Sequence, residues 1–278
     1  NYGDQLRGDI IADKNDFVYL ASNTSSSDFP VINADINAQF KGGSHDAVLV
    51  KLQPDLSQVV WSRMLGGSST DAAYSIKLDN TDGIYLAGGT SSSDFQGMNG
   101  LKPNFQGDVD GWIAHISGDG TQIIDATYLG TGFYDQAYLI DLNSANEVYA
   151  FGQTQGDYPV TGNVYTNPNS GQFLHKLSSD LRTTIFSTVI GSGTRSPNIS
   201  PTAFLVSECN TIYLSGWGGA VNNVTQGNIT RNYVGGNTQG LPISSDAYQK
   251  TTNGSDFYFM VLSGDAHTFL YGSFLGGT

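Results

Sequence analysis

The sequence predicts an all-β protein, and its composition and an internal repeat are the observations that carry this prediction. Glycine, tyrosine and phenylalanine account for 35, 15 and 14 of the 278 residues, and runs of Ser, Thr and Asn separate short apolar segments. Charged residues make up only 13% of the chain, about half the share in an ordinary soluble domain. Glycine-rich turns and aromatic residues are typical of strands, whereas helices favour Ala, Leu, Glu and Lys.

Two sequence markers recur along the chain and define four copies of one unit. The first is a strand of the Tyr-Leu-Ala type followed by a Ser-rich loop, at residues 18–30, 84–96, 148–159 and, more loosely, 212–217. The second is a closing Leu-Gly or Ile-Gly pair, within residues 64–67, 128–131, 189–192 and 274–277. The copies extend approximately over 4–67, 71–130, 135–191 and 199–278, with an insertion at 218–240 in the fourth.

Each copy reads as four short strands in succession. In the second copy these strands are expected at 74–78, 84–87, 111–116 and 122–129, with turn-forming clusters at 79–83 and 117–120. Four antiparallel strands per repeat, with glycine at their ends and no helical period, are typical of a β-propeller blade. We therefore expect residues 1–278 to form one β-propeller region of four four-stranded antiparallel blades.

The register of the copies bears on the closure of the ring. The chain starts just before the first strand of one copy and stops just after the last strand of another, so no strand is left over to complete a blade and latch the ring. Unpaired edges in a small ring are a liability. We expect the four blades to be part of a larger ring, and a self-contained four-bladed ring is the alternative.

The net charge limits the classes of binding partner, and the cysteine content excludes an internal disulfide. The 25 Asp and Glu residues outnumber the 12 Lys and Arg residues, which gives a formal net charge of −13 and argues against nucleic acid and anionic membrane surfaces. No apolar run approaches the roughly 18 residues of a membrane span. A single cysteine, Cys209, permits no internal disulfide, and its place beside an apolar strand predicts a buried, inert thiol.

The markers resemble a known family of repeats. Tyr-Leu-Ala-Gly at 85–88, Ser-Ser-Ser-Asp-Phe-Pro at 25–30, and the segments 209–219, 241–249 and 253–262 of the fourth copy resemble the SBBP-type propeller repeats of large surface proteins of Bacteroidota. The resemblance implies export by the type IX secretion machinery, a gliding-motility-type C-terminal sorting domain, and a secreted or cell-surface location. The family carries no agreed catalytic residues. The third copy departs from the pattern, because 170–176 lacks the Asp that opens the third strand elsewhere.

The long loops are the expected place for a ligand. They connect the second and third strands of each copy, at roughly 24–45, 90–109, 154–171 and 217–255, and they emerge with the crossovers between blades on one face. The insertion in the last of them carries the predicted ligand-binding residues Trp217, Tyr233, Asn222 and Asn223, an aromatic and amide set that suits a sugar ring. The alternative is that Trp217 buries itself under its own loop.

Recurring aspartates raise the question of a bound cation. Asp46, Asp110 and Asp256 precede the third strand of their copies, and Asp71 and Asp135 lie in the crossovers. Local clusters at Asp79 and Asp82 and at Asp108 and Asp110 suit Ca²⁺ by their chemistry, and no other cofactor is implied. The spacing does not match an EF-hand. An Asp at a fixed turn offset also accepts backbone N–H bonds, so an architectural role is the favoured reading.

The sequence shows no catalytic motif, neither a nucleophile elbow nor a zinc-binding His pair. The expected function is a non-catalytic scaffold for binding or adhesion, with a polysaccharide or a surface protein as the partner. Two alternatives remain open. One is a glycan hydrolase or lyase with its site at the channel mouth, and the other is a purely structural spacer.

Overall fold

The computed structural model describes residues 8–219 and 236–277. The strands of the first sheet are β1 (Asp9–Ala12), β2 (Val18–Thr24), β3 (Asp46–Leu52) and β4 (Val59–Leu65), and those of the second are β5 (Asp71–Leu78), β6 (Ile84–Thr90), β7 (Asp110–Ile116) and β8 (Ile123–Leu129). The strands of the third sheet are β9 (Asp135–Leu142), β10 (Val148–Thr154), β11 (Gln172–Leu177) and β12 (Thr184–Ile190), and those of the fourth are β13 (Ser200–Val206), β14 (Ile212–Trp217), β15 (Phe257–Leu262) and β16 (Phe269–Leu275).

Each sheet is an antiparallel meander in which strands pair in chain order. The only helical element among the described residues is the 3₁₀ turn η2 (Ile36–Ala38) in the loop between β2 and β3. The expectation of an all-β chain with four four-stranded antiparallel sheets is therefore confirmed. Alternating apolar residues along strands of four to eight residues account for this, because every strand has two faces to bury.

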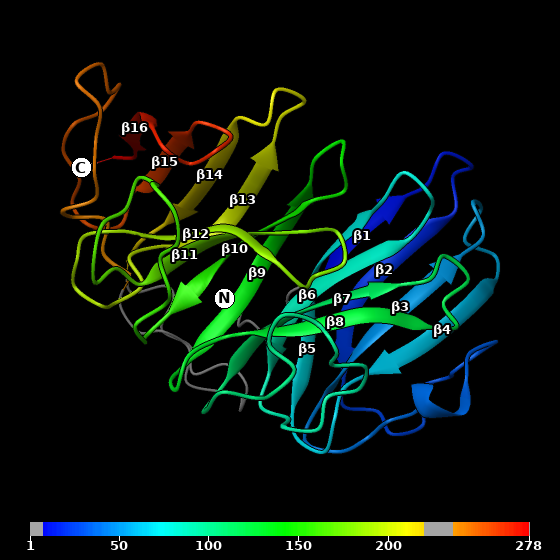
Figure 1. Ribbon diagram of the computed structural model, residues 1–278. Helices are drawn as coiled ribbons and strands as arrows, with labels where there is room; N and C mark the ends of the chain where they lie inside the picture. Colours follow the sequence, from blue (N-terminus) through cyan, green and yellow to red (C-terminus); the bar gives the residue numbers. More distant parts are fainter. Residues whose placement is uncertain (1–7, 220–235, 278) are drawn as a thin grey trace.

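The four sheets stand face to face in a row, from the first on the right of Figure 1 to the fourth on the left. The first strand of each sheet lies beside the first strand of the next, β1 against β5, β5 against β9 and β9 against β13. The first and fourth sheets are at opposite ends of the row (Figure 1). The core consequently consists of layers between sheets rather than one central cluster.

Each layer mixes residues of two successive sheets. Tyr19 and Trp61 of the first sheet pack with Ile76 and Leu86 of the second. The same arrangement recurs between the second and third sheets and between the third and fourth. A one-residue slip would turn each apolar set outward, so the stacking fixes the register of every strand.

The outward faces of the two end sheets remain open. The last residue of the fourth strand is 0–3% exposed in the first three sheets, where it is Leu65, Leu129 and Ile190. In the fourth sheet the residue at that register is Leu275, which is 48% exposed. Likewise Tyr19, Tyr85 and Tyr149 are buried, and the corresponding Tyr213 is exposed. We call Leu205, Tyr213, Trp217, Phe257 and Leu275 the open face of the fourth sheet.

The first sheet shows the complementary feature. Ile10 and Leu20, which pair with each other, are 65% and 36% exposed. The residues at that register in the second sheet, Ile76 and Leu86, are buried against the first sheet. A row of side chains that is core in the middle of the stack is thus surface at its end.

One prediction about the fold was wrong. Cys209 is exposed rather than buried. It lies at the tip of the turn between β13 and β14, where Ser207 and Asn210 close the chain reversal by a backbone hydrogen bond. The apolar strand that suggested burial begins only three residues later, at Ile212.

The stacking predicts unequal costs for the same substitution in different sheets. Leu129→Ala removes a fully buried side chain and is expected to lower the free energy of unfolding by about 2–5 kcal/mol. Leu275→Ala at the matching register of the open face is expected to change it by less than about 1 kcal/mol. Urea unfolding followed by tyrosine and tryptophan fluorescence measures both, and equal losses would contradict the open face.

Candidate functional site

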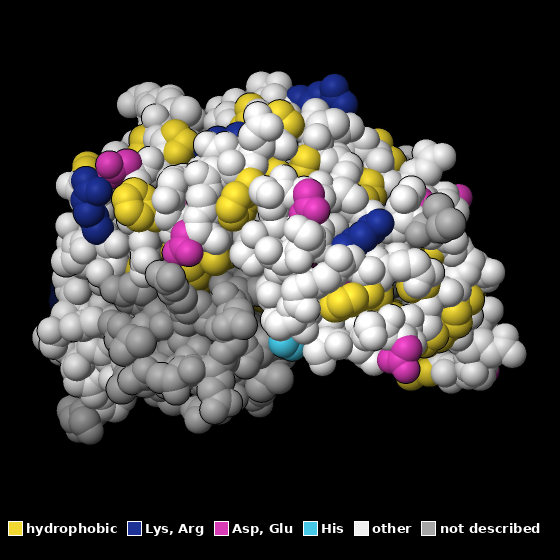
Figure 2. Space-filling model, turned by 90° about the horizontal axis from the view of Figure 1, so that it is seen from below, with side chains coloured by type: hydrophobic (Ala, Val, Ile, Leu, Met, Phe, Trp, Pro, Cys, Tyr) yellow, Lys and Arg dark blue, Asp and Glu magenta, His cyan; other side chains and the backbone are white. Residues whose placement is uncertain are grey.

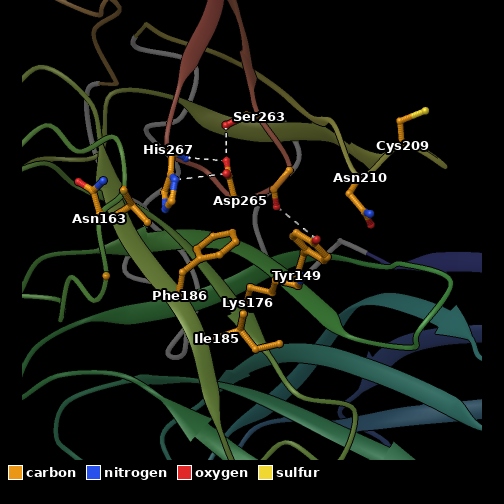
Figure 3. A pocket seen from close by; sticks show the side chains of 13 residues that line it. Tyr149, Asn163, Lys176, Ile185, Phe186, Cys209, Asn210, Ser263, Asp265 and His267 are labelled. Atoms are coloured by element: carbon orange, nitrogen blue, oxygen red, sulfur yellow. Dashed lines mark hydrogen bonds and ion pairs between the residues drawn. The ribbon is translucent and has the colours of Figure 1, made fainter.

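A pocket of about 540 Å³ lies between the third and fourth sheets (Figure 3). Its floor comes from β10, β11 and β12, which supply Tyr149, Lys176 and Phe186. Its walls come from two short turns of the fourth sheet and from residues 162–164 of the loop that follows β10. The lining side chains also include Asn163, Ile185, Cys209, Asn210, Ser263, Asp265 and His267.

The turn between β15 and β16 positions the polar wall. Asp265 accepts hydrogen bonds from the Ser263 hydroxyl at 2.5 Å and from the backbone N–H of His267 at 3.0 Å. Ala266 between them has a φ of 57°, which completes the tight reversal. The His267 ring is thereby held beside the Asp265 carboxylate, with Nδ1 at 3.2 Å from Oδ2 (Figure 3).

The charged groups of the pocket already have partners within the chain. Lys176 Nζ lies 2.6 Å from Glu147 and 4.7 Å above the centre of the Tyr149 ring. Burial is the largest single influence on the pKa of Lys176 and lowers it, but the hydrogen bonds and charges of Glu147 and Tyr149 together outweigh burial. The net shift is upward, so the ammonium stays charged. The hydrogen bond from Ser263 lowers the pKa of Asp265. The pocket therefore presents compensated charge.

At the corresponding places between the other sheets, side chains make contact across the interface. The residues at two registers explain why the third interface differs. Phe186 occupies the register of Trp61 in the first sheet and Asp125 in the second. The Trp61 ring packs directly against Gly120 of the next sheet. Asp125 receives Arg182 of the third sheet at 2.6 Å.

His267 stands at the position of Arg182 in its own turn, but it has no carboxylate to reach across the interface. Phe186 supplies only an apolar face there, and His267 pairs with Asp265 in its own turn. At this place the described residues of the third interface therefore supply neither a tryptophan ring nor a cross-sheet ion pair. This is the physical reason that space remains between the third and fourth sheets.

A second, smaller pocket of about 300 Å³ lies in the long loop of the third sheet. It is lined by Asp157, Tyr158, Val189 and neighbouring residues, and the exposed Arg195 pairs with Asp157 at 2.8 Å. Figure 2 views the molecule from below, where charged side chains of the described residues are few. The sequence predicted binding on the long loops, whereas the 540 Å³ pocket is lined by strand residues, by two short turns and by residues 162–164 of one long loop.

Of the predicted ligand-binding residues, only Trp217 is described. It is half-buried at the end of β14, opposite Phe257, and belongs to the open face of the fourth sheet. Tyr233, Asn222 and Asn223 lie outside the described residues. Sugar stacking by this set stays a prediction.

The first predicted calcium pair forms a turn. Asp79 Oδ1 accepts from the backbone N–H groups of Thr81 and Gly83 at 2.7 and 2.8 Å, and its other oxygen lies 3.3 Å from His115. Asp82 has a φ of 65°. The third sheet builds the same turn with an uncharged Asn143. This favours the architectural role.

The second pair is divided between different surroundings. Asp108 is exposed in the loop before β7, whereas Asp110 is fully buried at the start of that strand. Across residues 8–219 and 236–277, no three His, Cys, Asp or Glu side chains gather closely enough to hold a metal ion. The geometry of the described residues therefore does not support calcium binding at these positions.

The structure instead brings other recurring aspartates together, at what we call seams. A seam is the place where the start of the third strand in one sheet meets the start of the first strand in the next. The first seam joins Asp46 and Asp71, and the second joins Asp110 and Asp135, all four with 0% exposure. Sequence reasoning treated them as turn residues, because their pairing across two copies is not visible along the chain.

Burial changes the acidity of these groups. It raises the pKa of Asp46 to about 7, with the Asp71 carboxylate adding to the effect, and raises that of Asp71 to about 7. In the second seam burial raises the pKa of Asp110 to about 7 and that of Asp135 to about 6. Removal from water penalises the charged carboxylate, which is why the shifts share one direction.

Glycines of the repeat marker make room for the seams. A Cβ on Gly66 would lie 2.6 Å from Asp71 Oδ2 and 2.9 Å from Asp46 Oδ1, and Gly130 is crowded in the same way by Asp110. Gly276 is crowded by Asp256 in the fourth sheet. In the first two copies the closing Leu-Gly pair is therefore a leucine for the core followed by a glycine beside which a side chain would have no room.

Comparison with known proteins adds little. No family model matches the chain, and no curated protein sequence matches it. A luciferin-regenerating enzyme matches with 12% identity and a TM-score of 0.39, over 82% of this chain and 58% of that protein. A Bacteroides caccae protein of unknown function matches with 10% identity and a TM-score of 0.25, over 82% of this chain and 90% of that one. These similarities are too low to bear on function.

The described residues contain no helix of the length and apolarity that a membrane crossing requires.

Turn chemistry at Asp79 predicts a response that a calcium ligand would not give. Asp79→Asn keeps the acceptor that Asn143 provides in the third sheet and is expected to leave stability nearly unchanged. Asp79→Ala is expected to cost roughly 1–2 kcal/mol, because two backbone N–H groups lose their acceptor. Thermal unfolding of the unaltered protein is expected to be the same in calcium and in EDTA. A rise in the melting temperature with calcium that Asp79→Asn abolishes would contradict this account.

Proposed function

We propose that the chain forms blades of a β-propeller and serves as a non-catalytic binding or adhesion scaffold outside the cell, with a polysaccharide or a protein as its ligand. The row of four-stranded meanders, with the first strand of each sheet beside the first strand of the next, supports the propeller. The repeat markers, through their resemblance to SBBP-type repeats, support a secreted or cell-surface location and export by type IX secretion.

The open faces support a ring larger than four blades. Tyr213 and Leu275 occupy registers that are core in the other three sheets, and Ile10 and Leu20 do the same on the first sheet. A further blade against each face would bury these side chains in the way that the internal interfaces already do. Contiguous apolar surface of this kind marks a site of protein contact.

The pocket between the third and fourth sheets is the observation that carries the binding role. Phe186 and Ile185 make one side of the pocket apolar, while Asn163 and Asn210 offer amide groups. Lys176 and His267 are each paired with a carboxylate of the chain. An apolar surface with a few polar groups beside it suits a ligand that has both an apolar ring face and hydroxyl groups, such as a sugar unit.

A matched pair of variants tests the pocket. Ile185 and Ile124 share one register on the last strands of the third and second sheets and are 42% and 43% exposed, but only Ile185 lines the pocket. Ile185→Trp is expected to fill the pocket and to weaken binding at least about tenfold, a loss of about 1.4 kcal/mol. Ile124→Trp is expected to bind like the unaltered protein.

The assay uses immobilised polysaccharides and intact cells as probes, with chromatography of the soluble fraction. Retention without released oligosaccharide supports the scaffold. Released oligosaccharide would replace it with a glycan hydrolase or lyase. Equal binding by the two variants would show that the ligand binds outside the pocket. If the protein is retained on none of the probes, the structural spacer becomes the favoured function.

A further inference from the structure

The first seam joins two buried acids from different sheets at one point. Asp46 opens β3 of the first sheet and Asp71 opens β5 of the second. Both side chains have 0% exposure, and Asp46 Oδ1 and Asp71 Oδ2 flank the same side of Gly66. Two carboxylates that are excluded from water and crowd the same glycine repel each other if both are charged.

Their hydrogen bonds are unequal. Asp71 accepts from the Gly67 N–H at 2.8 Å, from the Ser92 hydroxyl at 2.9 Å and from the Thr90 hydroxyl. Asp46 accepts through Oδ2 from the Lys41 N–H at 2.7 Å, while its Oδ1 has no hydrogen-bond partner and is fully buried. Asp71 thus receives three hydrogen-bond donors, whereas one oxygen of Asp46 receives none.

Other charged or titratable groups near the seam do not resolve this. Asp94, which accepts from the Ser68 N–H, adds negative charge beside Asp71. Lys41 contributes a favourable but distant charge. The His45 ring is engaged with Ser44 at 3.0 Å, and the Tyr128 hydroxyl donates to the Ser92 carbonyl. None of these groups donates to Asp46 Oδ1.

We propose that the first seam is a proton-binding site, in which Asp46 carries a proton on Oδ1 and directs it towards the Asp71 carboxylate. The proton supplies the missing donor and removes one of the two negative charges. It thereby ties the first sheet to the second. This inference stands apart from the proposed ligand pocket, which lies between other sheets.

The third seam shows how the chain solves the same problem without acids. Gly171 replaces the aspartate, and the backbone of Ser196 and Pro197 fills the space a side chain there would need, at 2.2 Å. Asn198 takes the part of Asp71, with Oδ1 accepting from the Ser192 N–H at 2.9 Å and Nδ2 donating to the Asn237 carbonyl at 2.7 Å. The third seam therefore holds no acid at either position, and the Asn198 amide supplies its own donor.

Protonation of Asp46 makes folding stability depend on pH in a definite direction. The pKa of Asp46 is near 3.8 in an unfolded chain and about 7 in the folded one. Between these pH values the unfolded chain releases the proton and the folded chain keeps it, so stability falls as pH rises from about 4 to about 7 and levels off above that. Asp46→Asn, with an amide donor in place of the protonated oxygen, escapes this loss.

The test compares melting temperatures of the unaltered protein and of Asp46→Asn from pH 4 to pH 8. The advantage of Asp46→Asn is expected to grow with pH by roughly 4 °C or more and then to level off. Asp256→Asn is the matched control, because Asp256 holds the same register in the fourth sheet, where the three atoms nearest a Cβ on Gly276 all belong to Asp256 and none to a second acid. Its difference from the unaltered protein is expected to lack this pH-dependent rise.

A constant difference for Asp46→Asn across the pH range would overturn the proposal. So would a melting temperature that rises with added sodium, magnesium or calcium ions only when Asp46 is present, since the seam would then hold a cation. Carbon NMR of the unaltered protein, labelled at the aspartate carboxyl carbons, provides a check that needs no folded variant. The carboxyl signal assigned to Asp46 is expected to remain protonated at pH 6, and a charged Asp46 at that pH would also overturn the proposal.

Discussion

The stack depends on one constraint, that each sheet has two apolar faces and is covered only by its neighbours. A lone four-stranded sheet of this kind has no core of its own, so tyrosine and leucine at fixed registers, such as Tyr85 and Leu129, repeat from copy to copy. The period-two alternation of strands then fixes which residues meet across each interface. The exposure of Tyr213 and Leu275 is the same constraint seen where no described neighbour is present.

The seams follow from that packing. Where sheets meet face to face, the polar ends of strands are carried into the interior and must find partners there. The glycine that follows the closing leucine lets an acid from a neighbouring strand approach the backbone, as Asp46 does at Gly66. The leucine fills a layer of the core and the glycine leaves a space beside it, so two adjacent marker residues serve opposite needs.

The sequence allowed the sheets and their strand order to be predicted, because each repeat marker has a local role in a strand, a turn or a core layer. The turn role favoured for Asp79 also came from local spacing. The pocket was not predictable in this way, since it arises where Phe186 of one copy faces His267 of the next. Aligning the copies shows both as departures from Trp61 and Arg182, and this was the available signal. The pairing of Asp46 with Asp71 likewise needs two sheets placed in space.

The departures from the repeat gather at one interface. Between the third and fourth sheets the seam is neutral, through Gly171 and Asn198, and the opposite part of the interface is hollow beside Phe186. The first two interfaces have buried acid pairs and filled cross-sheet contacts instead. A ligand in the pocket would touch both sheets of an interface that no titrating seam controls. On these two proposals, ligand binding belongs to the third interface, and the response of stability to pH belongs to an interface with a buried acid pair.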